Sequence, residues 1–232
     1  MSTKKVSREW IVIVAFVVTA LWFFFPIGEP EGKCLVFALR LALPATILTI
    51  GCIGLLPKLM TIGFLFCAIG DVMGVIGSFE GQVGGFAVAH ICFICHFAKG
   101  IRSLKSNPAR FTVATLLCLA ALILAVQKVI PMIQDLPIRI GCSVYSLLLT
   151  GTVWTSIVRS QLDERKVINV AAIGAVCFLA SDFILAWNKF VEHIPHASLC
   201  IMTTYYAALL LLFVGIYGES KRNRASRIPY QY

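Results

Sequence analysis

Long blocks of apolar residues alternate with short polar connections along the whole chain. A membrane-spanning helix needs about 20 apolar residues, with a range of about 17–25. Eight blocks approach this length, at residues 10–25, 34–56, 61–77, 84–98, 111–129, 138–158, 167–187 and 198–218. Because a chain in lipid must satisfy its backbone hydrogen bonds internally, the pattern predicts an all-α integral membrane protein with eight transmembrane helices.

Composition supports this class and leaves no room for a separate soluble domain. Of the 232 residues, 59% are hydrophobic and only 13% are charged, whereas soluble domains have about 25% charged residues. We therefore expect residues 1–232 to form a single eight-span membrane domain. The basic start of the chain is followed by no small-residue cleavage site, so the first block is expected to remain as a span.

The net charge of +9 is explained by topology and gives no reason to expect a nucleic-acid partner. Lysines and arginines gather beside the apolar blocks, and in membrane proteins such clusters mark the cytosolic side. With eight spans, fifteen of the twenty would face one side, Arg40 would lie inside a span, and four would face the other side, namely Lys33, Lys128, Arg139 and Lys189. This asymmetry predicts that both termini are cytosolic.

Nine cysteines raise the question of disulfides or metal binding. All but one lie well within apolar blocks, where a free cysteine behaves as a small hydrophobic residue, so we expect no disulfide framework. The segment His90–His96, "HICFICH", contains a single Cys-x-x-Cys inside such a block. Zinc sites of that type need a second pair of ligands, so packing is the favoured interpretation and no metal is predicted.

Ionisable side chains within a span are costly, and by default they indicate a functional site. With helices rising 1.5 Å per residue, one polar residue from each of five blocks falls roughly 8–11 Å below the non-cytosolic surface. These five residues are Arg40, Asp71, His90, Asp182 and Tyr205. Their shared depth predicts a common cavity, which His96, lying deeper, does not join.

A structural alternative exists for each of these groups. Asp71 and Asp182 could pair with Arg40 or bond to Ser181 and the tyrosines, which would join helices without chemistry. Arg40 alone could equally be a structural counter-ion or a lipid-headgroup contact. Small residues allow helices to approach closely, and this packing interpretation applies to Gly70, Gly74, Gly77, Ala171, Gly174 and Ala175.

Four segments carry a resemblance to a known family. "AIGDVMG", "FAVAH", "GAVCFLASDFILAWNKF" and "IMTTYYAA" resemble the signature blocks of the YhhN / lysoplasmalogenase family, particularly those of its animal members. The resemblance implies eight spans in the endoplasmic reticulum membrane, and we predict no cofactor. It also implies a hydrolase that cleaves the vinyl ether bond of lysoplasmalogens to a fatty aldehyde and glycerophosphocholine or glycerophosphoethanolamine.

The resemblance also assigns positions within the predicted site. The matching positions are Asp71, Asp182, His90, Arg40, Tyr205 and Tyr206. In the animal members glutamine typically follows the "TTYYAA" segment, and this chain has Leu209 there.

Acid chemistry cleaves a vinyl ether, because protonation of the alkenyl carbon gives an oxocarbenium-like ion that water then attacks. Two carboxyl groups in opposite protonation states would supply a proton and a stabilising charge. We therefore expect Asp71 and Asp182 to form this pair, with His90 orienting water or relaying a proton. Substrate-binding roles are expected for Arg40, Lys189, Ser181, Tyr205 and Tyr206, with Arg40 or Lys189 contacting the phosphate.

Two other classes of function use similar residues. An intramembrane charged layer could move lipids or ions, although the chain has no inverted repeat of the kind many transporters show. A lipid-binding protein without catalysis is the other alternative. The sequence gives no prediction of oligomeric state.

Overall fold

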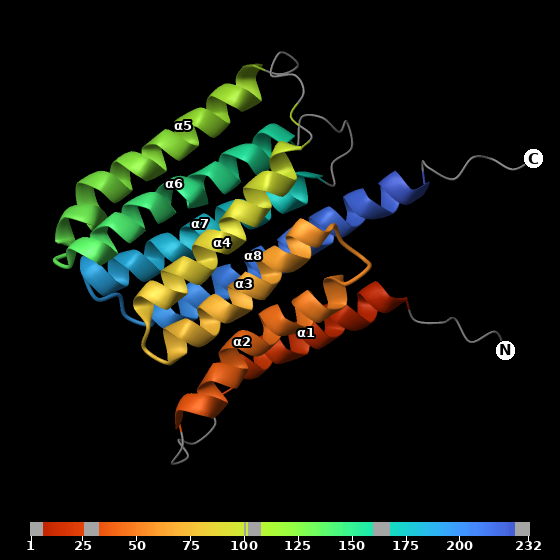
Figure 1. Ribbon diagram of the computed structural model, residues 1–232, viewed down its shortest axis with the longest axis horizontal. Coiled ribbons are helices and arrows are strands. Elements are labelled where there is room, and N and C mark those ends of the chain that lie inside the picture. The colour runs from red at the N-terminus through yellow and green to blue at the C-terminus, as the bar shows by residue number, and fades with distance from the viewer. Residues whose placement is uncertain (1–6, 26–32, 100, 102–107, 160–167, 226–232) are drawn as a thin grey trace, which may run out of the picture. The chain divides into compact units, whose positions relative to one another are not determined.

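The computed structural model describes residues 7–25, 33–99, 101, 108–159 and 168–225 (Figure 1). Within these ranges the chain contains eight α-helices and no β-strand, which confirms the predicted all-α class. The helices are α1 (Arg8–Phe24), α2 (Lys33–Cys52), α3 (Lys58–Val75), α4 (Phe79–Ala98), α5 (Pro108–Leu124), α6 (Leu136–Arg159), α7 (Ile168–Phe190) and α8 (Ala197–Ala225).

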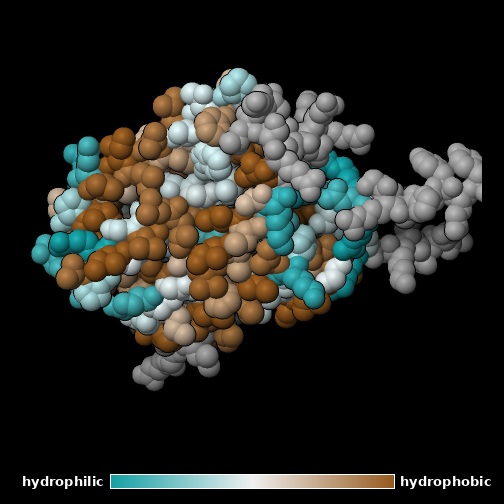
Figure 2. Space-filling view, turned by 45° about the horizontal axis from the view of Figure 1, so that its top comes forward, coloured by the Kyte–Doolittle hydropathy of each residue, from teal (hydrophilic) through white to brown (hydrophobic). Residues whose placement is uncertain are grey.

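Six of the described helical segments are long and apolar enough to cross a membrane. They are α3, α4, α6, most of α7 and α8, and the segment Phe111–Met132, in which α5 continues through a π-helical and a 3-10 turn. Hydrophobic residues cover much of the face shown in Figure 2. Large apolar side chains such as Val14, Val18, Val113 and Leu116 are exposed, as expected for a surface that contacts lipid.

Several helix ends differ from the predicted ones by three residues or more, and the start of α4 and the end of α8 are among the largest differences. α4 begins at Phe79 and not at residue 84, because Ser78 caps it: the backbone N–H of Gly81 donates to Ser78 Oγ at 3.1 Å. α8 continues beyond residue 218 to Ala225. Its last turn carries basic residues, which interact favourably with the C-terminal end of a helix dipole.

The first of two compact units comprises residues 1–89, with α1, α2, α3 and the first half of α4. Helix α2 packs against both α1 and α3. Gly51 of α2 allows the close contact with α1, since a Cβ there would lie 2.5 Å from a methyl group of Val12. Gly77 has a φ of +86°, and a Cβ added to it would meet no atom of the described residues within 4 Å. It therefore terminates α3 as a turn residue, and the packing interpretation was wrong for this glycine.

Helices α3 and α4 approach each other closely at Gly70 and Gly85. A Cβ on Gly85 would lie 2.9 Å from both Cα and N of Gly70. Because these are backbone atoms, they cannot move aside as a flexible side chain would. The packing interpretation is confirmed for Gly70, and this crossing fixes the backbone of the adjacent Asp71.

Replacing Gly85 with alanine should destabilise the protein by about 1–3 kcal/mol, the usual cost of overpacking. Gly84→Ala is the matched control, because a Cβ at the neighbouring position meets no atom within 4 Å. Thermal unfolding of both variants in detergent measures the difference. Equal melting temperatures for the two variants would contradict the close backbone contact.

The second unit comprises residues 90–232, with the rest of α4 and helices α5 to α8. Neighbouring helices along the chain pack side by side from α5 to α8 (Figure 1). A Cβ on Gly174 would lie 2.8 Å from the backbone N of Leu212, and one on Gly215 would lie 2.6 Å from the backbone N of Ala171. The predicted small-residue contact at Ala171 and Gly174 is thus confirmed, and its partner is α8.

Part of the charge asymmetry concerns residues outside the described ranges. These are Lys4, Lys5, Arg102, Lys105, Arg165, Lys166 and Arg227. Val167, the predicted start of the seventh span, also lies outside them. The eight cysteines whose side chains are described are all free thiols.

Candidate functional site

His90 lies at the centre of a buried cluster formed by four helices of the second unit. Its side chain is fully buried. The centroid of its ring lies 4.7 Å from that of Phe178 in α7 and 5.5 Å from that of Tyr145 in α6. Phe178 in turn contacts Tyr205 of α8, with ring centroids 5.4 Å apart. A polar residue predicted from its place in an apolar block is therefore enclosed by aromatic rings.

The two ring nitrogens of His90 have different surroundings. Nδ1 lies 2.9 Å from Oγ1 of Thr152 in α6. Nε2 is buried and has no hydrogen-bond partner in the part of the chain that the structure describes. Buried polar atoms are normally paired, so an unpaired ring nitrogen is an exception that favours a chemical role.

Asp182 is buried in the same cluster, and Tyr145 holds its carboxyl group. The phenolic O–H of Tyr145 donates a short hydrogen bond to Oδ2 of Asp182. Because Tyr145 also contacts the ring of His90, it connects the predicted acidic residue with the predicted histidine. The sequence reasoning missed Tyr145, although it lies seven residues after the predicted start of its block, as Tyr205 does in its own.

The other predicted residues of α7 and α8 surround this cluster. Ser181 Oγ donates to the carbonyl oxygen of Ile201 at 3.0 Å, and this hydrogen bond joins α7 to α8. Tyr205 and Tyr206 are both buried, with ring centroids 5.6 Å apart. Leu209 is fully buried one turn further along α8. Lys189 is exposed near the end of α7, with Nζ 5.8 Å from the ring centroid of Phe190.

Asp71 and Arg40 belong to the first unit, so the predicted pairing of Asp71 with Asp182 stays a prediction. Asp71 is 2% exposed in α3. Arg40 reaches back to the end of α1, where its Nη2 donates to the carbonyl oxygens of Trp22 at 2.6 Å, Phe23 at 2.8 Å and Phe25 at 2.5 Å. Unpaired carbonyls at the end of a helix attract cations. The contact supports the structural role weighed for Arg40, and a phosphate contact stays a prediction.

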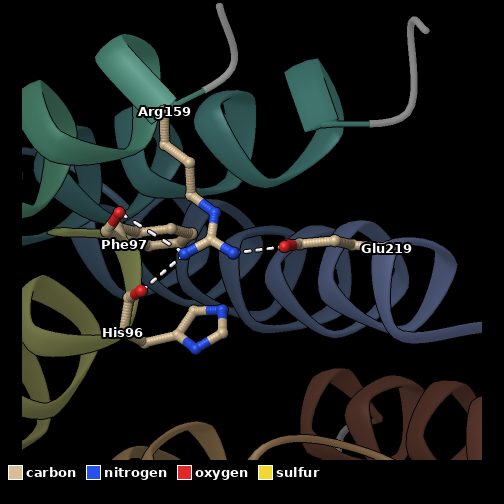
Figure 3. A network of polar contacts seen from close by, with 4 residues as sticks. All are labelled: His96, Phe97, Arg159 and Glu219. Carbon is tan, nitrogen blue, oxygen red and sulfur yellow. Dashed lines mark hydrogen bonds and ion pairs between the residues drawn. The ribbon is translucent and has the colours of Figure 1, made fainter. Parts of the chain in front are cut away.

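A second polar network lies at the C-terminal end of α4 (Figure 3). Arg159, the last residue of α6, donates from Nη1 to the carbonyl oxygens of His96 at 2.5 Å and Phe97 at 3.4 Å. Its Nη2 forms an ion pair with Glu219 of α8. The sequence reasoning counted Arg159 only as a basic flank, and its side chain instead joins α4, α6 and α8.

The "HICFICH" segment does not concentrate ligands for a metal ion. Its cysteines differ in environment, because Cys92 is buried and Cys95 is exposed. Among the described residues, no group of three histidine, cysteine or acidic side chains is arranged to hold a metal. The arrangement joins Asp182 and Tyr145 by a hydrogen bond and places the ring of His90 against that of Tyr145.

Comparison with known proteins gives a consistent result. The profile of the YhhN family matches residues 32–216. The lysoplasmalogenase TMEM86B of Sus scrofa is 32% identical over 163 residues, which cover 68% of this chain and 64% of the relative. The human lysoplasmalogenase TMEM86B is 32% identical over 155 residues, covering 65% of this chain and 60% of the relative.

A bacterial relative with lower sequence identity is also named a lysoplasmalogenase. The lysoplasmalogenase of Mycobacterium tuberculosis is 27% identical over 135 residues, or 58% of this chain and 49% of the relative. This chain therefore spans less than two thirds of the length of each of these relatives. No solved structure matches it.

Proposed function

The chain belongs to the YhhN family, and we propose on that premise that it hydrolyses the vinyl ether bond of lysoplasmalogens. The products are a fatty aldehyde and glycerophosphocholine or glycerophosphoethanolamine. Relatives from mammals and bacteria are named lysoplasmalogenases. The observation that carries the proposal is the buried cluster of His90, Tyr145 and Asp182, since it places acid–base groups among the helices of a membrane protein.

Hydrolysis of a vinyl ether requires proton transfers at carbon and at oxygen. An acid first delivers a proton to the alkenyl carbon β to the ether oxygen, which leaves an oxocarbenium-like cation at the carbon bonded to oxygen. Water then adds to that carbon and loses a proton. The resulting hemiacetal collapses to an aldehyde as its hydroxyl group loses a proton and its ether oxygen gains one, which frees the glycerol hydroxyl. A negative charge beside the developing cation lowers the barrier, since preorganised electrostatics is a major source of catalysis.

We assign these tasks to the residues already described. Asp71 and Asp182 act as a pair in which one carboxyl group delivers the proton while the other, ionised, stabilises the cation. Tyr145 orients Asp182 through their hydrogen bond. His90 accepts the proton of the attacking water at Nε2, which has no hydrogen-bond partner among the described residues.

We propose substrate contacts for the remaining groups. Either Lys189, exposed near the end of α7, or Arg40 contacts the phosphate of the lysophospholipid. Ser181, Tyr205 and Tyr206 line the path of the alkenyl chain close to Asp182. Leu209 adds apolar surface where the animal family members typically carry a polar glutamine.

The proposed topology is eight crossings with both termini in the cytosol, in the endoplasmic reticulum membrane. Six described segments have the length and composition of a span. The asymmetry of lysine and arginine supports the sidedness, and the family resemblance supports the organelle. The active centre then lies in the half of the membrane away from the cytosol.

Purified full-length protein should release aldehyde from a 1-alkenyl lysophospholipid and none from the matched 1-alkyl lysophospholipid. The two lipids differ only in the double bond that the acid protonates, so detergent effects and headgroup binding cancel. Aldehyde is measured through NADH consumption by a coupled alcohol dehydrogenase. Absence of aldehyde from the alkenyl lipid, with the protein folded and monodisperse, would refute the proposed activity.

A further inference from the structure

Thr152, which the proposed mechanism does not use, makes the hydrogen bond that fixes His90. Its Oγ1 lies 2.9 Å from Nδ1 of His90 and 3.1 Å from the backbone carbonyl oxygen of Leu148. Thr152 is 1% exposed, so water cannot replace either contact freely. His90 and Thr152 lie on different helices, α4 and α6, and this bond joins them.

The positions of the hydrogens in this pair follow from counting donors. A threonine hydroxyl has one hydrogen to donate. The carbonyl oxygen of Leu148 can only accept, so the hydroxyl hydrogen of Thr152 points to Leu148. With that hydrogen directed to Leu148, Nδ1–H of His90 donates the bond between the two side chains and Thr152 Oγ1 accepts it. In a neutral histidine the proton on Nδ1 leaves Nε2 as the acceptor.

The opposite tautomer would be poorly accommodated. It would place a hydrogen on Nε2, which is buried and has no acceptor within the described residues. It would also require Thr152 to turn its hydroxyl from Leu148 to His90. The surroundings of both nitrogens therefore favour the same tautomer.

We propose that Thr152 is a positioning residue that holds His90 in the Nδ1–H tautomer and so presents the lone pair of Nε2 to the attacking water. This inference rests on the proposed function for its kinetic consequence. The assignment of the tautomer itself rests only on the hydrogen bonds.

Thr152→Val removes the acceptor while keeping the branched shape of the side chain. We expect kcat to fall about tenfold, a typical effect of losing one hydrogen bond of this kind, with little change in KM. Thr152→Ser retains the hydroxyl and should restore most of kcat. Thr155→Val is the matched control on α6: Thr155 bonds back to the carbonyl of Gly151 at 2.7 Å, and within the described residues it has no side-chain partner.

A readout independent of turnover separates the two proposals. ¹⁵N NMR of ring-labelled histidine, in the full-length protein in lipid bilayers, distinguishes protonated from unprotonated Nδ1 and Nε2. We expect a buried histidine with Nδ1 protonated in the wild type and in Thr152→Ser, and a tautomer mixture in Thr152→Val. Wild-type protein with this signal but no aldehyde release would refute the activity and leave the tautomer assignment standing.

Either of two outcomes alone would overturn the inference, and a third would count against it. One is a wild-type His90 signal with Nε2 protonated. The other is a Thr152→Val variant with wild-type kcat in an active enzyme. A loss of kcat in Thr155→Val equal to that in Thr152→Val would also count against it, because general damage to α6 would then explain both.

Discussion

We expect the replacement of Asp182 with asparagine to remove nearly all aldehyde release while the protein stays folded. Asparagine keeps the size of the side chain and an oxygen that can accept the hydrogen bond from Tyr145. It can neither deliver a proton nor carry the charge that stabilises the cation. General acid catalysis contributes about 10²–10⁴-fold, so turnover should fall by at least about 10²-fold, measured as aldehyde formed by purified variants of equal melting temperature.

Asp71→Asn should give a loss of similar size if the two carboxyl groups act as a pair. Asp135→Asn is the matched control. Asp135 is exposed, and its Oδ1 caps α6 by accepting from the backbone N–H of Ile138 at 2.9 Å. Asparagine caps a helix equally well, so this variant should keep full turnover. Wild-type turnover in both Asp71→Asn and Asp182→Asn would rule out the paired-carboxyl mechanism.

The existence of the helices could be predicted because lipid imposes it, whereas their ends could not be read from hydropathy. An apolar block in a membrane has few structural options besides a helix. The first turn of α4 is polar, with Glu80 and Gln82, and its start depends on the cap formed by Ser78. A serine followed by an acidic residue in the first turn is a start signal for a helix. A search for apolar blocks does not detect this signal, because the residues that form it are polar.

The same physics explains which site residues were predicted. Asp182 and His90 stand out because a charged or titratable side chain in an apolar block is costly. Tyr145 does not stand out because most of its side chain is an apolar ring. Thr152 does not stand out because threonine hydroxyls in helices commonly bond to their own backbone, as Thr150 does to the carbonyl of Ser146 at 2.7 Å. Only the three-dimensional neighbours distinguish Thr152 from Thr150.

The ion pair of Arg159 and Glu219 shows how a topology signal can also be a structural element. Lysines and arginines at block ends indicate sidedness from their number alone. The side chains of Arg159 and Glu219 are only 12% and 13% exposed, so here the arginine is bound within the protein. The guanidinium also donates to two carbonyl oxygens at the end of α4. Arg159 therefore connects α4, the helix that carries His90, to α6 and α8.

Arg159→Met should therefore destabilise the protein strongly. The substitution removes the charge and keeps much of the side chain's length. It leaves the carboxylate of Glu219 buried without its partner, which typically costs 3–5 kcal/mol, and the carbonyls of His96 and Phe97 lose their donor. Thermal unfolding in detergent measures the loss as a lower melting temperature. Lys221→Met, an exposed position on α8, is the control and should melt as the wild type does.

The double variant Arg159→Met/Glu219→Met tests the cause of that loss. Replacing both partners of a buried ion pair by apolar residues is often neutral or stabilising, so the double variant should be more stable than Arg159→Met alone. The carbonyls of α4 remain without their donor, and recovery should for that reason be incomplete. If the double variant were no more stable than the single one, the ion pair would not be the source of the stability, and the contact of Arg159 with the end of α4 would carry it.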